Sequence, residues 1–382
     1  MTGFFCVCPV NLEAKIRIKL HWDGQRIGRA ELRPRPLVRA TELVGGKTAG
    51  QAAIVIPMLF SICGKAQGAA AAVALAFAQG SEPDRVAERE RLVLAEALQE
   101  LLWRFLLDLP KLMGGQGNPS LLAALRKGLA QAAAGQNETA WQTFAAQAET
   151  ALSQAILGVP VAEWRGFADP AQLPEWLHRA ETETARNLLE LWNGAGRWGG
   201  GGAALMPAAS SERILNEVLP GLEGDEHFSQ CPHWQGGVME TGSLARMQNH
   251  PLLAELLRQE GASILVRFLA RLCEMTELLD RLREPEEPGW VQGVALGQGI
   301  GLAWVQTARG LLLHRAELDG QGIVADYCIV APTEWNFHPA GSCVEALTGK
   351  PASSADEARR SAELLVQALD PCVAYSIEVE HA

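Results

Sequence analysis

The sequence predicts a mainly α-helical protein with small β elements near both ends, an α+β fold class. Residues 83–109 place apolar side chains at helical spacing among charged ones, as a partly buried helix does. Residues 14–20 instead alternate polar and apolar side chains, which is typical of a half-buried strand. Residues 311–318 and 322–330 flank an Asp-Gly turn, so we expect a second pair of strands near the C-terminal end.

The first β element is predicted to be a hairpin. A second apolar segment, 27–32, follows residues 14–20, and Asp23-Gly24 between them is a turn signal. The middle of the chain is predicted to be helical, and Pro110 is expected to end the helix at 83–109 because proline lacks a backbone N–H. The other predicted helices are 52–78, 120–134, 139–156, 173–191, 251–282 and 354–369.

The length of 382 residues alone is compatible with two or three domains or with one large helical domain. Residues 193–204 are rich in glycine, so this segment is the best candidate for a flexible loop or a boundary. We expect a single domain over residues 1–382.

Composition narrows the possible partners and the compartment. The net charge is −11 and no run of Lys or Arg is present, which argues against nucleic acid. The N-terminus lacks the pattern of a signal peptide, and no apolar run is long enough to predict a membrane span. Eight cysteines are too sparse for a disulfide framework, so we expect reduced thiols in the cytoplasm.

The C-terminal segment Asp370-Pro371-Cys372 follows a predicted helix. A thiol on a rigid turn near a helix end can be a metal ligand or a nucleophile. A buried structural cysteine is the alternative, and Cys372 alone does not decide between them.

Short motifs follow one another along the chain at 11–18, 39–42, 61–66, 234–246, 307–310, 326–336 and 370–372, while residues 80–225 carry no motif. In this order the segments resemble the large subunits of nickel–iron hydrogenases. The most telling are Cys63-Gly64 near the start and Asp370-Pro371-Cys372 near the end, which match the first halves of two cysteine pairs in that family. The resemblance implies a hydrogenase large-subunit-like fold.

In the family four cysteine thiolates hold the metals, two terminal on nickel and two bridging to an iron that carries cyanide and carbon monoxide. By this resemblance Cys63 and Cys372 are kept, while the bridging partners are replaced by Ala66 and Tyr375. Alanine has no ligand atom, and a phenol is a poor substitute for a bridging thiolate. The histidines that follow each pair are also replaced, by alanine at position 70 and glutamate at position 378. Hydrogen turnover is therefore not expected.

Other matched residues imply a pocket with hydrogen-bond donors for cyanide. Arg309 matches the arginine over the family's active site, and Thr333 matches a hydroxyl residue that approaches a cyanide. Glu13 matches the proton-gate glutamate. Glu42 matches an acidic ligand of a structural magnesium, although the glutamate at 378 in place of the matching histidine weakens the case for magnesium.

Cys6 and Cys8 lie close to the N-terminus. In an extended strand their thiols point to opposite faces, so they would not chelate one ion together. Small maturation chaperones carry iron on an N-terminal cysteine, and an iron-transfer role here is a hypothesis. The cysteines at 231, 273, 328 and 343 have no matched role and are expected to be core residues or incidental.

The pattern resembles HupK/HoxV-type accessory proteins, which share the large-subunit plan and act in cofactor assembly. No proteolytic tail is expected, because the chain ends at Ala382, four residues beyond Glu378. The resemblance implies a non-enzymatic scaffold that transiently holds or helps assemble iron with its cyanide and carbonyl ligands. Its partners would be chaperones of the HypC/HypD type and the catalytic large subunit. A degenerate but active nickel-dependent subunit and a metal-free structural partner stay open as alternatives, and so does the presence of nickel.

Overall fold

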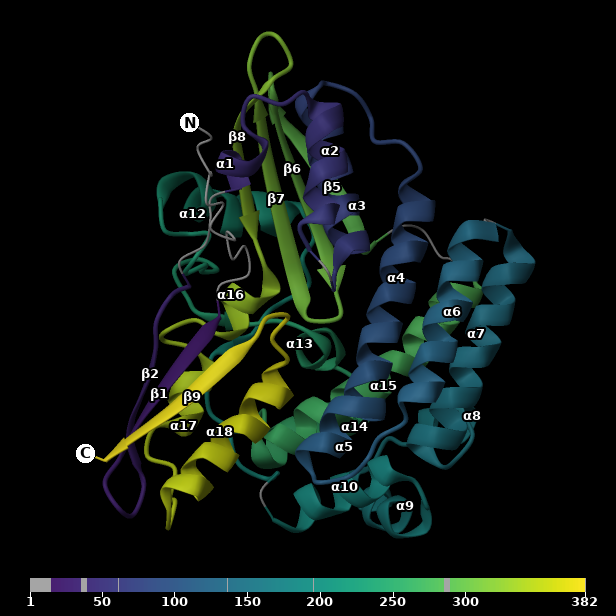
Figure 1. The fold of residues 1–382 in the computed structure, drawn as a ribbon, viewed down its shortest axis with the longest axis vertical. Helices are drawn as coiled ribbons and strands as arrows, with labels where there is room; N and C mark the ends of the chain where they lie inside the picture. The colour runs from purple at the N-terminus through teal and green to yellow at the C-terminus, as the bar shows by residue number, and fades with distance from the viewer. Residues whose placement is uncertain are drawn as a thin grey trace, which may run out of the picture.

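The computed structural model describes residues 15–35, 40–60, 62–135, 137–194, 196–284 and 289–381. The described chain is mainly helical with small sheets, so the predicted α+β class is confirmed (Figure 1). A four-stranded sheet lies at one end of the molecule, and most of the helices gather at the other.

A small sheet joins the two ends of the chain. The predicted hairpin is confirmed as β1 (Ile16–Trp22) paired antiparallel with β2 (Ile27–Leu32). β9 (Tyr375–His381), which was not predicted, runs parallel to β1 on its other side, with Ile18 opposite Ile377. The strand order β2-β1-β9 therefore places the residues after Cys372 beside the N-terminal hairpin (Figure 1).

The larger sheet is an antiparallel meander in the order β5-β6-β7-β8. The predicted C-terminal hairpin is confirmed as β7 (Gly310–Leu318) and β8 (Val324–Val330). The prediction missed β5 (Val291–Gly297) and β6 (Ile300–Thr307). The helix α3 (Gly64–Ala78) packs closely against the β5, β6 and β7 strands (Figure 1).

Three of the predicted helices are each two helices. The range 52–78 contains α2 (Ala49–Met58) and α3, separated by residues 59–63 after Pro57. The range 173–191 contains α9 (Leu173–Arg179) and α10 (Glu183–Asn193), because Thr182 begins a new helix by accepting the Ala185 N–H at 3.1 Å. The range 251–282 divides in the same way, at Gly261 and the N-cap Ser263, into α14 (Pro251–Glu260) and α15 (Ile264–Arg283).

Pro110 does not end its helix, so that prediction was wrong. After α4 (Val86–Trp103), the turn Arg104–Asp108 widens to a π-helix and α5 (Leu109–Leu112) continues with Pro110 in its first turn. The carbonyl of Leu106, which the missing proline N–H would otherwise leave unpaired, accepts the Asn118 N–H at 2.6 Å.

The predicted helices 120–134 and 354–369 are confirmed as α6 (Pro119–Gly135) and α18 (Ala355–Leu369). The predicted helix 139–156 is α7 (Glu138–Ala151) followed by a π-helical turn, Leu152–Leu157. The remaining elements are short: α1 (Ala40–Val44), α8 (Val161–Arg165), a 3₁₀ turn (Pro170–Gln172), β3 (Ala204–Leu205), α11 (Ser211–Arg213), a π turn (Ile214–Val218), α12 (Leu219–Gly224), β4 (Met239–Glu240), α13 (Ser243–Met247), α16 (Pro332–Asn336) and α17 (Ser342–Leu347).

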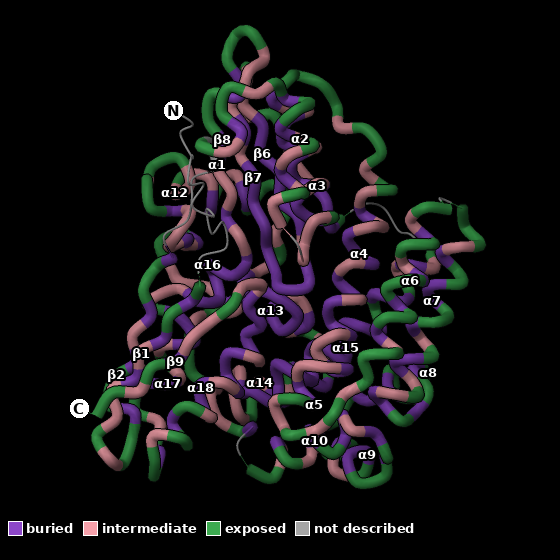
Figure 2. Tube along the Cα trace, viewed as in Figure 1, coloured by how far each residue is buried: buried purple, intermediate pink, exposed green. Residues whose placement is uncertain are grey.

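The main core is buried along α3, α4, α15 and the inner strands (Figure 2). The glycine-rich segment after α10 is hydrogen-bonded to the start of α15, through Ile264 N–H to Trp198 O at 3.0 Å and Ala262 N–H to Gly200 O at 3.2 Å. The single domain and the flexible loop stay predictions. Within the described ranges, no helix combines the length and the apolarity needed to cross a bilayer.

Candidate functional site

Cys63 lies at the break between α2 and α3, where it is the N-cap residue of α3. Its backbone carbonyl accepts the Gln67 N–H at 3.0 Å, which starts the helix. Its half-buried side chain receives a long hydrogen bond from the Gln67 amide, Nε2 to Sγ, at 3.9 Å. The break that the helical periodicity did not predict therefore places this thiol at a helix N-terminus.

Cys372 lies on the turn that follows α18. Asp370 ends this helix with a φ of 56°, in the left-handed region, and Pro371 follows. The sulfur of Cys372 is 3.0 Å from Thr333 Oγ1, and its backbone N–H reaches the same oxygen at 3.5 Å. Thr333 is buried in the first turn of α16, so a fixed hydroxyl group holds this cysteine from a different part of the chain.

The two cysteines and Arg309 line the same cavity, of about 660 Å³. Its walls come from α2, α3, β7, β8 and the segment 222–230. The structure thus brings together Cys63, Cys372 and Arg309, with Thr333 in contact with Cys372. These residues are up to 309 positions apart in the sequence, between 63 and 372.

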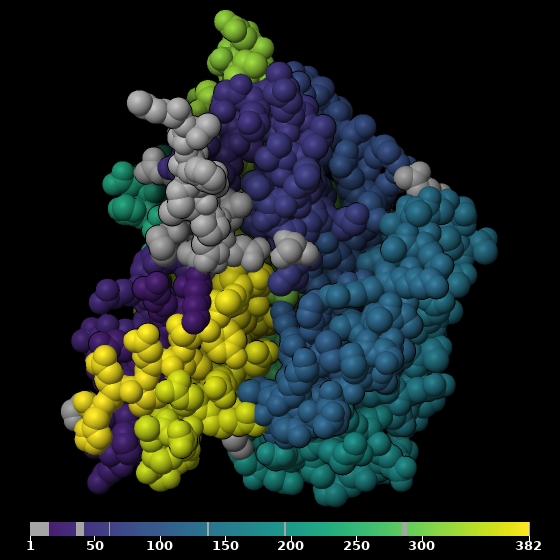
Figure 3. All heavy atoms as spheres, viewed as in Figure 1, coloured from purple at the N-terminus to yellow at the C-terminus, as the bar shows by residue number. Residues whose placement is uncertain are grey.

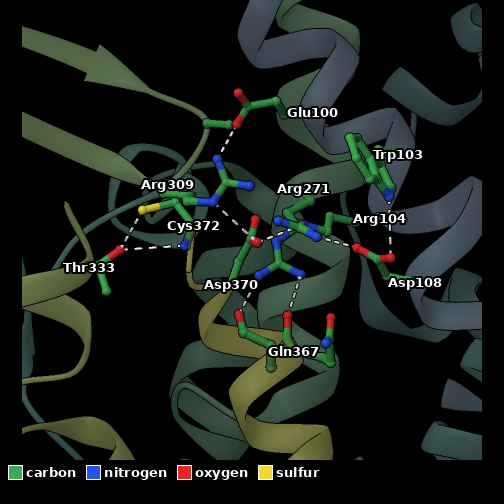
Figure 4. A network of polar contacts seen from close by, with 12 residues as sticks. Glu100, Trp103, Arg104, Asp108, Arg271, Arg309, Thr333, Gln367, Asp370 and Cys372 are labelled. Atoms are coloured by element: carbon green, nitrogen blue, oxygen red, sulfur yellow. Dashed lines mark hydrogen bonds and ion pairs between the residues drawn. The ribbon is translucent and has the colours of Figure 1, made fainter. Parts of the chain in front are cut away.

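Arg309 is buried between carboxylates (Figure 4). Its guanidinium donates a hydrogen bond to Glu100 on α4, and its Nε lies 3.4 Å from Asp370 Oδ1. Burial alone would lower the pKa of Arg309, but Glu100 and Asp370 raise it above its ordinary value. The residue therefore carries a permanent positive charge at the cavity wall.

Asp370 connects this charge to the cysteine turn. Its carboxylate is also 2.6 Å from Arg104 Nε, so two guanidinium groups contact it (Figure 4). Burial alone would raise the pKa of Asp370, but Arg104 and Arg309 lower it below its ordinary value. A carboxylate so held stays ionised and fixes the turn on which Cys372 lies.

Burial raises the pKa of the Cys63 thiol well above its ordinary value, and Cys372 and Glu100 raise it further. Arg309 opposes this effect without cancelling it. Cys63 is therefore a neutral thiol near pH 7, and it becomes a thiolate only when a cation compensates its charge.

The residues that replace the family's missing ligands have other surroundings. Ala66 and Ala70 are buried in α3. The hydroxyl of Tyr375 accepts a hydrogen bond from the Gln367 amide at 3.3 Å. Glu378 is exposed on β9. None of these positions supplies a thiolate to the site.

The remaining predicted site residues are not part of this cluster. Glu42 is exposed on α1. Glu13, Cys6 and Cys8 lie outside the described residues. Cys328, which was expected to be a core or incidental residue, lines the cavity as well.

Sequence reasoning missed Glu96 and Glu100 on α4. Glu100 pairs with Arg309, and Glu96 accepts the N–H groups of Lys65 and Ala66 at 2.8 and 2.9 Å, at the start of α3. A signal was present, because Glu100 lies among apolar residues on the buried face of α4, where a charged side chain is unusual. It also missed Gln67, His314 and Tyr327, whose side chains are joined to one another by hydrogen bonds next to Cys63.

The chain is similar to curated proteins over most of its length and to solved structures in its fold. No protein-family model matches the chain. The hydrogenase expression/formation protein HoxV of Cupriavidus necator is 33% identical over 93% of both chains. The chain belongs to the HoxV/HupK family of hydrogenase expression/formation proteins. Within this family, HupK of Bradyrhizobium diazoefficiens is 29% identical over 98% of this chain and 99% of that protein.

Solved structures support the fold of this HoxV/HupK-family chain. The nickel–iron–selenium hydrogenase of D. vulgaris Hildenborough superposes with a TM-score of 0.58 at 17% identity, over 92% of this chain and 94% of that one. An NAD⁺-reducing nickel–iron hydrogenase gives a TM-score of 0.51 at 20% identity, over the same shares of the two chains. The hydrogenase large-subunit-like fold is therefore confirmed.

Proposed function

We propose that this protein is a non-enzymatic maturation scaffold for hydrogenase. It holds or helps to assemble iron with its cyanide and carbonyl ligands, transiently, before the unit passes to the catalytic large subunit. The observation that carries the proposal is that Cys63 and Cys372 line one cavity together with Arg309.

The donor set fits such a cargo. Thiolates are soft ligands that suit iron carrying carbon monoxide and cyanide. The described residues contain no group of three or more His, Cys, Asp or Glu side chains that could hold a metal. The cargo would therefore depend on the two thiols and on the diatomic ligands that it brings with it.

Arg309 and Thr333 suit the anionic part of the cargo. A guanidinium whose charge is permanent attracts a cyanide nitrogen, and a buried hydroxyl can donate a hydrogen bond to one. Because Glu100 and Asp370 hold Arg309 in place, its charge needs no rearrangement when the cargo enters.

Weak retention is useful in a carrier. The raised pKa of the Cys63 thiol means that its sulfur must lose a proton to bind iron and regains it readily on release. Ala66 and Tyr375 leave the site without bridging thiolates, so we infer that hydrogen turnover does not occur here. Nickel and magnesium are not part of the proposal.

The partners follow from the proposed role. We infer that the protein receives its cargo from chaperones of the HypC/HypD type and delivers it to the catalytic hydrogenase large subunit, in the cytoplasm. Cys6 and Cys8 are proposed as iron-transfer residues, and serine at both positions would leave maturation unchanged if that role is absent. From the same resemblance, Glu13 is proposed as a proton-gate-like residue and Glu42 as a magnesium-like ligand position.

The experiment is genetic and spectroscopic. Cys63→Ala and Cys372→Ala should each block hydrogenase maturation in the host while the purified variants stay folded. Cys231→Ala is the matched control, because Cys231 is similarly half-buried but does not line the cavity. Normal hydrogenase activity in both variants would overturn the proposal, and so would hydrogen oxidation by the purified wild-type protein carrying stoichiometric nickel.

A further inference from the structure

A chain of buried polar side chains leads from the sheet to Cys63. The hydroxyl of Tyr327 on β8 lies 2.8 Å from Nδ1 of His314 on β7. The other ring nitrogen, Nε2, lies 2.9 Å from Oε1 of Gln67 on α3. The amide nitrogen of Gln67 then reaches Cys63 Sγ at 3.9 Å.

The orientation of the Gln67 amide, with its oxygen toward His314 and its nitrogen toward Cys63, gives these hydrogen bonds a direction. His314 is fully buried, and burial lowers its pKa to about 3, so the ring is neutral at physiological pH. A neutral imidazole donates from one nitrogen and accepts at the other. Because Gln67 Oε1 can only accept, Nε2 carries the hydrogen and Nδ1 accepts from the Tyr327 hydroxyl. The carboxamide is thereby fixed with its N–H group toward the sulfur.

We propose that Gln67, His314 and Tyr327 are positioning residues that present an amide N–H to the Cys63 sulfur of the iron-holding pair. This inference rests on the proposed function. Thr333 gives the Cys372 sulfur a comparable neutral partner at 3.0 Å. Each sulfur of the pair thus has one uncharged hydrogen-bonding group beside it.

The consequence for the cargo is electronic. A hydrogen bond to a metal-bound sulfur draws electron density from the sulfur and weakens its donation to iron. Such a bond moderates the hold of Cys63 on iron without adding a further ligand. It also fixes the orientation of the thiol at the start of α3.

The first arm of the test uses the full chain without cargo. Nitrogen-15 NMR of labelled histidine should show the Nε2–H tautomer for His314. Tyr327→Phe, which removes only the hydroxyl group, should give a mixture of the two tautomers. Observation of the Nδ1–H tautomer in the wild type would overturn the proposal, because Nε2 would then accept from Gln67 and turn the amide oxygen toward Cys63.

The second arm uses infrared spectra of protein loaded with iron, cyanide and carbon monoxide. Gln67→Leu should shift the carbonyl band to lower wavenumber, since a sulfur without its hydrogen bond donates more strongly to iron. Tyr327→Phe should shift the band in the same direction by less. Gln248→Leu, which alters a half-buried glutamine that does not line the cavity, should leave the band in place.

An unchanged carbonyl band in a folded Gln67→Leu variant would overturn the proposal. The two arms separate the possible failures. Wild-type protein that takes up no iron contradicts the proposed function. The tautomer of His314 is measured without iron, so it still decides whether the Gln67 amide directs its N–H group toward Cys63.

Discussion

Arg309 keeps its positive charge inside the protein because Glu100 and Asp370 contact its guanidinium. The sequence predicted Arg309, Thr333, Cys63 and Cys372 as site residues through short motifs. It could not predict that Glu100 pairs with Arg309, because the two positions are 209 residues apart. Gln67 and His314 were missed for the same reason, since their contact spans 247 residues. Motifs identify residues at a site, and only the fold identifies their partners.

The ion pair between Arg309 and Glu100 can be tested by a double-mutant cycle. Arg309→Met leaves a carboxylate buried without its partner, so it should lower the free energy of unfolding by about 3–5 kcal/mol. Adding Glu100→Gln to this variant should recover part of the loss. Urea unfolding of the two single variants and the double variant measures the effect, and strictly additive losses would contradict the pairing.

His314 should make the free energy of unfolding depend on pH. Its pKa is lowered to about 3 in the folded protein, while an unfolded histidine titrates near 6.5. Between these two pH values the unfolded chain binds one more proton than the folded protein. The contribution of His314 to the free energy of unfolding is therefore fully present above pH 6.5 and is lost progressively as the pH falls toward 3. The slope from this residue approaches about 1.4 kcal/mol per pH unit. Urea unfolding of His314→Gln across this range should show a shallower slope, and an unchanged slope would contradict the assignment.

At the scale of elements, the position of Cys63 depends on how α3 sits on the sheet. Helical periodicity predicted the region but not the break at residues 59–63, because nothing in the apolar spacing marks it. The missed strands β5 and β6, together with β7, form the surface on which α3 packs. Gly301 on β6 allows this contact, since a Cβ there would lie 2.0 Å from Ala74 O.

Gly301→Ala should therefore destabilise the protein by roughly 1–3 kcal/mol or more, as overpacking does. It should also move the start of α3 relative to Cys372, which chemical cross-linking of the two thiols would report. Gly50→Ala is the matched control, because Gly50 is helical and has open space around it. That variant should be more stable by about 0.5–1 kcal/mol. Thermal unfolding of both variants measures these changes in stability. A stabilised Gly301→Ala variant together with a destabilised Gly50→Ala variant would contradict the packing of α3 on the sheet.

At the scale of the whole molecule, the two ends of the described chain close against each other. β9 pairs with β1, and Figure 3 shows the C-terminal residues packed beside the N-terminal strands. Cys372 lies three residues before β9, so this pairing helps to set its place. The alternation of Tyr375, Ile377 and Val379 with polar residues was a usable strand signal. Its partner strand could not be predicted, because it lies more than 350 positions away.

Ile377→Ala should lower the free energy of unfolding by about 2–4 kcal/mol, because Ile377 is buried opposite Ile18. Glu378→Ala on the exposed face of the same strand should change it by less than about 0.5 kcal/mol. Chemical denaturation of the two variants makes the comparison. Equal changes in the free energy of unfolding for the two variants would contradict the packing of β9 against the core.

We propose that Cys63 and Cys372 hold iron with its diatomic ligands. The most direct measurement is the infrared spectrum of the protein isolated from a host competent in hydrogenase maturation, with iron and nickel content determined on the same sample. We predict cyanide and carbonyl bands together with iron, and their loss in Cys63→Ala and in Cys372→Ala but not in Cys231→Ala. A wild-type protein that carries neither iron nor these bands, in cells that mature hydrogenase normally, would contradict an iron-holding role for the two cysteines.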